Sequence, residues 1–559
     1  MIPAGRSRRA GTFSTGCSAT LAAAAETGPG RADPGSRVTA AGGPRTLPAA
    51  VAHLLWQSGR VTAPPSRSAV AIVGGGISGL AAALFLRDQG LAVTVLEGLP
   101  RIGGKLSVSE VAGVAVDEGA EALLARRAEG TDLIGAVGLA GQLEVPGTTA
   151  AGIWTRGRLR PLPRRQLMGV PADLGELAES GILSPAGMAR ARDDLRLPPS
   201  ARDGDVPVAS FVGARFGQEL VDRLVDPLLG GVYAGRSDEL SYEATLGGLA
   251  QSSRQHRSLA DAAASLLPLP GTPPGLPVFT TLAGGLGTLP AAVAAASGAI
   301  VRTGTMAREL TRTADSEGGM GRRAGGGRWR LTVGPARAPE TLEADAVILA
   351  VPARPASRLL AGVPGAAPAA AALGEIGYAS MAIVTLAYRR GAFGRPPEGS
   401  GYLVPAVDGR PVKAVTFSTV KWPHLAAGGT GLDIVRCSVG RQGEEALLQR
   451  DDAELAELAA ADLAAATGVR GAPADVRVSR WGGGLPQYTV GHLDRVARIR
   501  AAVAAQPGLA VCGAAYDGIG IPACIASARL AADQVMAYLR AGPAQPCNLG
   551  TTSTTSHVR

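Results

Sequence analysis

The stretch from Val70 to Glu97 constrains the fold of this chain more than any other. It reads as an apolar strand, a turn with glycines at Gly74, Gly76 and Gly79, an alanine-rich helix over 80–89, and a second strand that ends in an acid, Glu97. In such a unit the first glycine permits a tight turn, the second lets a pyrophosphate approach the backbone, and the third lets helix and strand pack closely. The helix N-terminus supplies N–H donors, and an acid in the position of Glu97 accepts hydrogen bonds from a ribose diol.

This arrangement predicts a dinucleotide-binding βαβ unit. The alternative is an ordinary βαβ unit that binds nothing, because glycine-rich turns are common in a chain with 78 glycines. The strand, the helix and the spaced acid favour the first interpretation. A second strand over Leu509–Ala515 and a small-residue helix over Ile521–Leu539 close the core. One nucleotide cofactor held by segments from both ends explains this pair better than two separate nucleotide sites.

Composition narrows the class of protein. Of the 559 residues, 46% are hydrophobic and 18% charged, which is typical of a globular chain with a large core. Aromatic residues make up only 4%, which argues against a nucleic-acid partner bound by base stacking. The net charge of +9 comes mainly from arginine and favours an acidic small molecule as ligand.

Cysteine and histidine usage points away from metal chemistry. The five cysteines are widely spread without a Cys-x-x-Cys pair, which predicts a reducing compartment and no structural zinc. The five histidines are equally scattered, so we expect no metal site and no histidine-based catalytic dyad. No apolar run is long enough to span a bilayer, which leaves a peripheral membrane contact open. We expect a cytoplasmic protein, with the inner face of the cell membrane as the place of any such contact.

A double-glycine segment follows the first unit. The chain reads Arg101-Ile-Gly-Gly-Lys105 and then Val116-Asp-Glu-Gly-Ala-Glu-Ala122. Two adjacent glycines let the backbone lie flat against a large ligand, and NAD enzymes have no general need for this second element. The combination resembles the glutathione-reductase-like FAD-binding fold, in the branch of amine oxidases, phytoene desaturases and protoporphyrinogen oxidases.

Later motifs narrow the resemblance. They are Leu167-Met-Gly-Val-Pro171, Asp226-Pro-Leu-Leu-Gly-Gly-Val-Tyr-Ala-Gly235 with Leu240-Ser241, Leu485-Pro-Gln-Tyr-Thr-Val-Gly-His492, and Gly513-Ala-Ala-Tyr-Asp-Gly-Ile-Gly-Ile-Pro-Ala-Cys-Ile525. Spread over about 70–540, they are similar to the FAD-dependent coproporphyrinogen III / protoporphyrinogen IX oxidase family of bacteria. The implied fold class is α/β: a glutathione-reductase-like FAD-binding domain with a Rossmann βαβ unit, a discontinuous α+β substrate domain and a helical subdomain.

The predicted organisation has seven parts. Residues 1–68 are a disordered or mis-started extension, with a transit peptide as the alternative, and 542–559 are a disordered tail. The FAD-binding domain takes 69–150, 275–370 and 479–541, a helical substrate- or membrane-facing subdomain takes 151–274, and a β-rich substrate domain takes 371–478. Within these parts we expect a mobile hairpin tip over 318–327, a strand-rich region over 380–437 and a helix over 444–466.

The resemblance implies a set of noncovalent FAD contacts. Those on the pyrophosphate and adenosine are Gly74, Gly75, Gly76, Ile77, Ser78, Gly79, Glu97 and Ala307, where relatives usually have Val. Those along the middle of the cofactor and its flavin ring are Gly104, Lys105, Gly119, Ala120, Glu121, Ala122, Trp481, Ile519, Gly520 and Ile521. Relatives often have Asp in place of Glu121. The alternative role for Trp481 is that of an ordinary core aromatic. We expect Cys512 and Cys524 to be small buried hydrophobic residues.

The implied reaction is oxidation of coproporphyrinogen III to coproporphyrin III. It proceeds by three hydride transfers to flavin N5, with molecular oxygen reduced to peroxide. Four propionates need cationic partners, and arginine offers bidentate pairing. Arg126 and Arg127 follow the predicted flavin loop and are the candidate substrate contacts. A second arginine cluster, with a solvated basic face as its alternative, comprises Arg156, Arg158, Arg160, Arg164 and Arg165.

Other functions stay open at this point. The substrate could be protoporphyrinogen IX, the chain could be another flavin oxidase acting on amines or carotenoids, or it could be a flavin-retaining binding partner in haem synthesis. Catalytic acids and bases stay unassigned, because no constellation of residues marks one. Transfer of the product to a ferrochelatase is a further partner implied by the resemblance.

Overall fold

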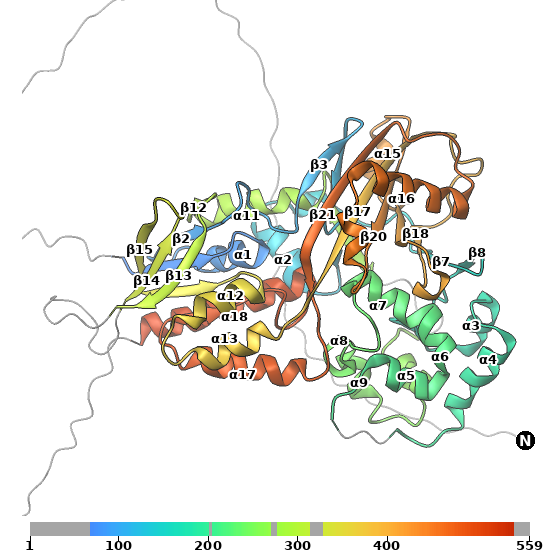
Figure 1. Cartoon of the computed structure of the whole chain (residues 1–559), viewed down its shortest axis with the longest axis horizontal. Coiled ribbons are helices and arrows are strands. Elements are labelled where there is room, and N and C mark those ends of the chain that lie inside the picture. Colours follow the sequence, from blue (N-terminus) through green and yellow to red (C-terminus); the bar gives the residue numbers. More distant parts are fainter. Residues whose placement is uncertain (1–66, 201–203, 270–276, 314–327, 542–559) are drawn as a thin grey trace, which may run out of the picture. The chain divides into compact units, whose positions relative to one another are not determined.

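A parallel sheet lies at the centre of the predicted nucleotide-binding half of the computed structural model (Figure 1). The structure describes residues 67–200, 204–269, 277–313 and 328–541. The strand order is β12-β2-β1-β16-β22, and every neighbouring pair is parallel. The strands are β1 (Ala69–Val73), β2 (Ala92–Leu96), β12 (Ile300–Arg302), β16 (Ala346–Leu349) and β22 (Leu509–Val511). This sheet confirms that segments from both ends of the core build one unit.

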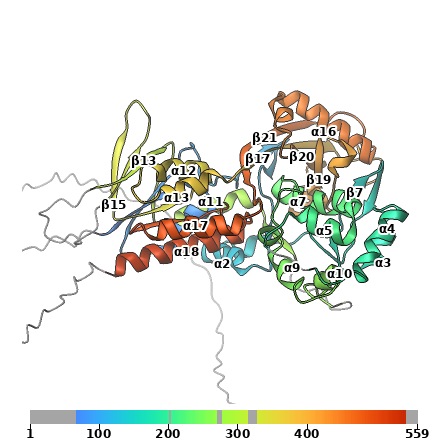
Figure 2. The ribbon, with the colours of Figure 1, turned by 60° about the horizontal axis from the view of Figure 1, so that its bottom comes forward.

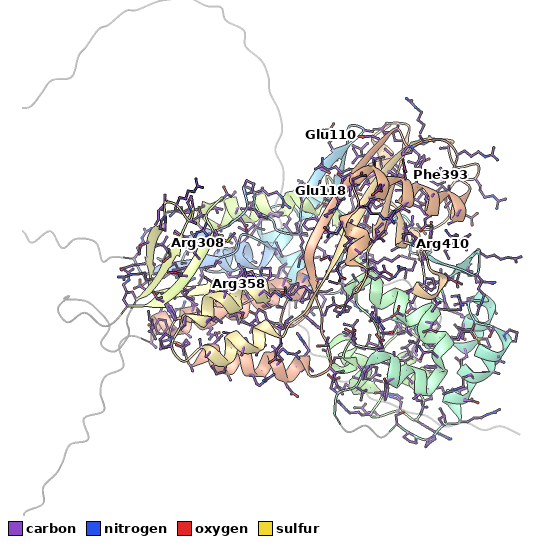
Figure 3. The ribbon with its side chains drawn as sticks, in the orientation of Figure 1. Glu110, Glu118, Arg308, Arg358, Phe393 and Arg410 are labelled. Atoms are coloured by element: carbon purple, nitrogen blue, oxygen red, sulfur yellow. The ribbon has the colours of Figure 1, made fainter. Side chains whose placement is uncertain are left out.

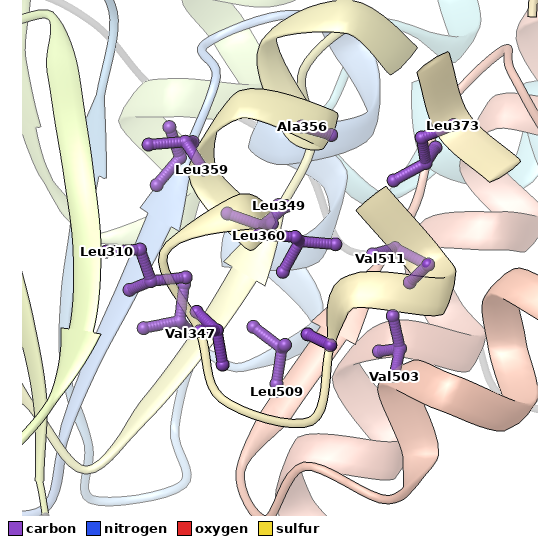
Figure 4. Close-up of a cluster of buried hydrophobic side chains, with 14 of the residues drawn as sticks. Leu310, Val347, Leu349, Ala356, Leu359, Leu360, Leu373, Val503, Leu509 and Val511 are labelled. Atoms are coloured by element: carbon purple, nitrogen blue, oxygen red, sulfur yellow. The ribbon is translucent and has the colours of Figure 1, made fainter. Parts of the chain in front are cut away.

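Alternate residues of β1 enter two separate cores, as expected for a strand buried on both faces. Val70 and Ile72 pack with one cluster, and Ala71 and Val73 with the other. The first core is covered by α1 (Ile77–Phe85), α11 (Leu289–Ser297) and α18 (Ile521–Arg540). The second is covered by α12 (Ala353–Ala361), α13 (Ala367–Gly374) and α17 (His492–Ala504), as Figure 4 shows for its leucines and valines.

Smaller sheets flank the central one. An antiparallel sheet comprises β13 (Ala307–Arg312), β14 (Trp329–Val333) and β15 (Glu340–Ala344). A hairpin comprises β3 (Val108–Val111) and β4 (Val114–Asp117), and a third sheet comprises β5 (Leu123–Leu124), β11 (Phe279–Leu282) and β6 (Leu143–Glu144). Helix α2 (Ala128–Ala136) follows β5. The loop between β4 and β5 contains the predicted flavin-ring residues.

A seven-stranded sheet forms the second half, in the order β21-β17-β20-β19-β18-β7-β8. Its strands are β7 (Gly152–Thr155), β8 (Arg158–Pro161), β17 (Tyr378–Arg389), β18 (Gly401–Leu403), β19 (Val412–Phe417), β20 (Leu432–Val439) and β21 (Asp475–Pro486). Helix α16 (Asp452–Thr467) covers it through Leu455, Ala459 and Leu463 (Figure 2). The short helices α14 (Ser418–Lys421) and α15 (Pro423–Ala427) lie between β19 and β20 along the chain.

The region predicted to be helical over 151–274 is helical only in its later part. It begins with β7, β8, β9 (Gln166–Leu167) and β10 (Val170–Pro171), and β7 joins the large sheet because it pairs with β18. The longer helices that follow are α3 (Leu174–Ser180), α4 (Pro185–Arg192), α5 (Val208–Phe216), α7 (Asp226–Tyr233), α9 (Gly247–Ser252) and α10 (Leu259–Ala264). They share a core of their own.

Three other expectations need correction. The predicted helix over 80–89 is α1, which starts at Ile77 and ends at Phe85, since Asp88 has a left-handed φ of 59°. The predicted helix over 444–466 is two helices, because the Asp451 side chain accepts a hydrogen bond from the Glu454 N–H at 2.8 Å and starts α16 anew. The predicted domain boundary at 478/479 falls inside β21.

The strand-rich region predicted over 380–437 is confirmed. Residues 1–66 of the predicted extension, the tail 542–559 and the predicted hairpin tip 318–327 lie outside the described residues.

Candidate active site

The turn between β1 and α1 is packed too tightly for any side chain at two of its glycines. A Cβ on Gly79 would lie 1.9 Å from the Gly74 carbonyl oxygen. Gly74 has a φ of +112°, and its Cβ would lie 2.5 Å from the Ala350 oxygen. Gly76 differs, because a Cβ there would meet no atom within 4 Å. The turn is therefore closed on its inner side and open at Gly76, where α1 begins without a side-chain cap.

Glu97 lies beside this turn at the end of β2. Its two carboxylate oxygens accept hydrogen bonds from the backbone N–H groups of Gly75 and Leu99, each at 2.8 Å. Each oxygen keeps a further lone pair for a ribose hydroxyl. The Glu97 carbonyl accepts from the Thr305 N–H at 2.7 Å, which brings Ala307 to this side of the turn.

Sequence reasoning missed Met306, the neighbour of Ala307. A Cβ on Gly98 would lie 2.7 Å from the Met306 Cε, so this side chain lies directly over the chain that follows Glu97. Met306 is 50% exposed and large enough to cover a flat ring, whereas Ala307 is small and half-buried. No motif marks Met306, because the Val of relatives corresponds to the next residue, Ala307.

The double-glycine segment closes onto the same turn. The Gly103 N–H donates to the Gly75 carbonyl at 2.8 Å, and a Cβ on Gly104 would lie 3.4 Å from the Gly76 Cα. Lys105 follows, and burial lowers its pKa below the usual value of lysine. The structure thus brings Gly104, one of the two predicted contacts on the middle of the cofactor, beside Gly76.

The loop over 118–122 is attached to β21 and to the double-glycine segment. Trp481 on β21 donates from Nε1 to the Glu118 carbonyl at 3.0 Å, and a Cβ on Gly119 would lie 2.0 Å from the Lys105 oxygen. The Glu118 carboxylate pairs with Arg477 at 2.8 Å, and Figure 3 labels Glu118 where this loop meets the strand. Trp481 therefore has a specific polar contact beyond that of a plain core aromatic.

Glu121 faces two cations from the large sheet rather than open space. Its carboxylate pairs with the Lys421 ammonium at 2.6 Å and with Nη1 of Arg436. Burial alone would raise the pKa of Glu121, but these two cations outweigh it and hold the pKa at about 2. Nη2 of Arg436 also donates to the Gly119 carbonyl at 2.6 Å. The side chain of Glu121 is therefore committed to protein partners, and its backbone remains for a ligand.

Sequence reasoning also missed Lys421 and Arg436. They lie 300 and 315 residues from Glu121 along the chain, so no local pattern links them. One signal was available for Lys421: the chain contains only three lysines, Lys105, Lys413 and Lys421. Because arginine is used at almost every other basic position, a lysine indicates a position where an ammonium group is needed.

The turn before α18 completes the arrangement. The Tyr488 hydroxyl donates to the Ala514 carbonyl at 2.7 Å and accepts from the Gly518 N–H at 2.8 Å, which fixes the turn that leads into Ile519, Gly520 and Ile521. Gly520 is the N-cap of α18 and has no side-chain cap. A Cβ on Gly513 would lie 3.9 Å from the Ser78 Oγ, so the turn that follows β22 lies close to the start of α1.

The predicted substrate arginines lie on the surface next to the flavin-loop segment. Arg127 is the N-cap of α2, and its guanidinium pairs with Glu129 at 2.5 Å, with 44% of the side chain exposed. Arg126 is exposed. In the second cluster, Arg156 pairs with Glu219 and Arg165 donates to the Pro268 carbonyl at 2.8 Å, while Arg158 and Arg164 are exposed. Four of the five arginines of this cluster are thus used in local contacts or are solvated.

These residues fit an FAD molecule. The open cradle at Gly76, the two uncapped helix starts of α1 and α18, and the free lone pairs of Glu97 suit a diphosphate with a ribose. The segments at Gly104, Gly119 and Trp481 continue from that cradle towards the large sheet. Within the ranges that the structure describes, no three His, Cys, Asp or Glu side chains cluster as metal ligands. None of the helices in those ranges has the length and apolarity that a bilayer span needs.

Comparisons with known proteins show which family the chain belongs to. The family of flavin containing amine oxidoreductases matches residues 77–536. The chain is 38% identical over 478 residues to the coproporphyrinogen III oxidase of Mycobacterium bovis, covering 84% of this chain and 98% of that protein. It is 31% identical over 483 residues to the enzyme of the same name from Bacillus subtilis, with coverages of 84% and 98%.

A solved structure gives the same answer for the fold. A crystal structure from Exiguobacterium, described as a protoporphyrinogen oxidase, superposes with a TM-score of 0.72 at 31% identity over 85% of this chain and 99% of that one. The predicted α/β class with a glutathione-reductase-like FAD-binding domain is confirmed. The chain belongs to the flavin-containing amine oxidoreductases and, within them, to the family of coproporphyrinogen III and protoporphyrinogen oxidases, with FAD as its cofactor.

Proposed function

We propose that this protein oxidises coproporphyrinogen III to coproporphyrin III, with three molecules of oxygen reduced to three of hydrogen peroxide. The observation that carries this proposal is its 38% identity, over nearly the full length of the relative, to a coproporphyrinogen III oxidase. FAD, when bound, supplies the acceptor for each of the three hydrides that the porphyrinogen loses from its methylene bridges. The chain's own residues bind and orient the reactants and exclude bulk water.

The roles of the residues follow from their contacts. Gly76 and the start of α1 would hold the diphosphate, with Glu97 on the ribose and Met306 and Ala307 beside the adenine. Trp481 and Arg436 hold the carbonyls of Glu118 and Gly119, so they fix the loop on which the flavin ring would rest. Glu121 acts through this loop and is a positioning residue.

Noncovalent attachment of FAD is supported by the state of Cys524. This thiol is only 6% exposed, and burial raises its pKa, so the thiolate that a covalent bond to the flavin requires is disfavoured. Denaturation in acid should therefore release all of the yellow cofactor into the supernatant.

The remaining proposals concern surroundings and partners. We place the protein in the cytoplasm, with any membrane contact peripheral, and a ferrochelatase as the recipient of the product after its oxidation. Arg126 and Arg127 would present cations to substrate propionates. Co-sedimentation with lipid vesicles and pull-down of a ferrochelatase test the two partner proposals separately.

The second candidate substrate is protoporphyrinogen IX, favoured by the 31% identity to the Exiguobacterium protein. The two substrates differ by two propionates, so they differ in the number of cations that they need. Anaerobic mixing of the holoprotein with each porphyrinogen, followed by the bleaching of flavin absorbance, tests both. Faster bleaching by coproporphyrinogen is expected. Bleaching by an amine or a carotenoid precursor, and by neither porphyrinogen, would overturn the proposal.

A further inference from the structure

A polar cavity lies between the flavin loop and the short helices α14 and α15. Its volume is about 20 Å³, which is room for about one water molecule. Its polar lining comprises Asp117, Glu121, Thr281, Ser418, Trp422, His424 and Arg436. The first three come from the nucleotide-binding half and the others from the large sheet and its helices, so the cavity lies where the two halves meet.

Three of these side chains have buried polar atoms without a partner among the described residues. They are the Ser418 Oγ, the Trp422 Nε1 and the Arg436 Nε. Ser418 and Trp422 are 2% exposed and Arg436 is 7% exposed. Buried donors in native proteins are almost always hydrogen-bonded to protein or to ordered water. Three such donors around one cavity indicate that a ligand satisfies them there.

The chemistry of the lining selects the ligand. An indole N–H and a guanidinium Nε–H can only donate, so the ligand must accept hydrogen bonds. Asp117 and Glu121 face the same space, and the nearby His424 ring pairs with Glu144 at 2.6 Å. The negative charges of these carboxylates offset the positive charges of Lys421 and Arg436. An anionic ligand is therefore disfavoured in the cavity. Because carboxylate oxygens can only accept, the ligand must also donate.

We propose that this cavity is a binding site for ordered water, which accepts hydrogen bonds from the Trp422 Nε1–H and the Arg436 Nε–H and donates its two hydrogens to the Ser418 Oγ and to Asp117. Water is the small neutral molecule that meets both requirements, and two to four polar partners are typical of an internal water. The Asp117 oxygens already accept from the Leu286 and Gly287 N–H groups at 3.0 and 2.9 Å, which fixes the acid as one wall of the site.

The site makes Arg436 a positioning residue. Its Nη1 and Nη2 hold Glu121 and the Gly119 carbonyl, and the water would hold its Nε, so all edges of the guanidinium are fixed. This consequence rests on the proposed FAD site, because it matters only if the loop over 118–122 supports the flavin. The hydration site itself is independent of that proposal.

Crystals of the full chain with FAD, grown in sodium bromide, test the ligand directly. An ordered oxygen within hydrogen-bond distance of at least two of the three donors supports the proposal. An anomalous bromide peak in the cavity would overturn it in favour of an anion site. So would an empty cavity, or donors rotated onto protein acceptors.

Two serine variants give a second readout that needs no substrate. Ser438 on β20 also has an unpartnered Oγ but does not line the cavity. If water holds Ser418, then S418A lowers the melting temperature by about 1–3 °C and raises the Kd for FAD about threefold, while S438A leaves both unchanged or raises the melting temperature. If S418A stabilises the protein as S438A does, the cavity is dry and the proposal fails. If S418A lowers the melting temperature but leaves the Kd for FAD unchanged, the water site stands and only its coupling to the flavin loop is rejected.

Discussion

Arg436 on β20 donates hydrogen bonds to both the carboxylate of Glu121 and the neighbouring Gly119 carbonyl, and so joins the large sheet to the flavin loop. The guanidinium is 7% exposed and the carboxylate 13%, so water screens the pair little. Lys421 pairs with the other carboxylate oxygen. The two halves of the protein are therefore connected electrostatically at the place where cofactor and substrate would meet.

Replacing Glu121 tests this connection. Glu121→Gln would leave Lys421 and Arg436 buried without an anion, so we expect a loss of about 3–5 kcal/mol of stability and a weaker hold on FAD. The pKa of about 2 lies below the ordinary 4.5, so the stabilisation is complete above pH 4.5 and is lost as the pH falls towards 2. Thermal unfolding at pH 7 measures the first effect. Glu129→Gln, at a half-exposed pair, is the control and should change stability by less than about 1 kcal/mol.

His492 should make stability fall in mild acid. Burial lowers its pKa to about 4 from an ordinary 6.5, while its Nε2–H donates to the Tyr516 carbonyl at 3.1 Å. Its contribution is complete above pH 6.5 and is lost as the pH falls towards 4, by up to about 2 kcal/mol at pH 5. Comparison with His492→Gln isolates this part. Burial raises the pKa of Asp117 to about 6, so protonation of this acid increases stability as the pH falls below 6. Wild type and His492→Gln share this effect, and it cancels when the two are compared.

If the difference in melting temperature between wild type and His492→Gln is the same at pH 7 and pH 5, then His492 does not titrate in this window and the assignment is wrong.

The glycine turn separates folding from cofactor binding. Gly76→Ala meets no protein atom, so we expect an apoprotein of unchanged melting temperature whose Kd for FAD rises at least tenfold, because the Cβ would occupy the place of the diphosphate. Gly79→Ala should instead prevent folding, since its Cβ would overlap the Gly74 oxygen. Gly135→Ala on the exposed face of α2 is the matched control. Equal FAD binding by Gly76→Ala and wild type would contradict the predicted site.

Arg127 offers a test of substrate recognition. Arg127→Ala should raise the KM for coproporphyrinogen about tenfold through the loss of one charge-assisted contact, with flavin content unchanged. Glu129→Gln frees the guanidinium from its present pair and should leave the KM equal or lower. Steady-state kinetics at fixed ionic strength measure both. If Arg127→Ala changes neither KM nor flavin content, this arginine does not contact the substrate.

Local patterns account for what the sequence predicts well. The βαβ unit around Gly74 and the unit around Gly520 each lie within about 30 consecutive residues, so strand, turn and helix signals coincide there. Helix ends were less predictable, since Asp451 divides a continuous helical pattern by capping α16. The strand β7 was missed because one of its pairing partners, β18, lies more than 240 residues away, and β8 was missed with it because β8 pairs with β7.

The candidate site divides in the same way. Residues in glycine motifs, such as Gly76 and Gly104, could be assigned because the motif itself approaches the ligand. Lys421 and Arg436 could not, because their function depends on a contact across the two halves of the fold. Burial and charge pairing of this kind follow only from tertiary structure.

The first strand of the central sheet begins at Ala69, but its last strand, β22, lies after residue 508. The helix α18, which covers one face of the sheet, follows β22 in the chain. During synthesis, β1, β2 and β16 therefore leave the ribosome long before their closing partner exists. The edge of β16 would stay unpaired while the residues between Leu349 and Leu509 are synthesised, and it needs protection from aggregation, by a chaperone or by the nascent chain itself. Loading with flavin should be a post-translational event in this protein.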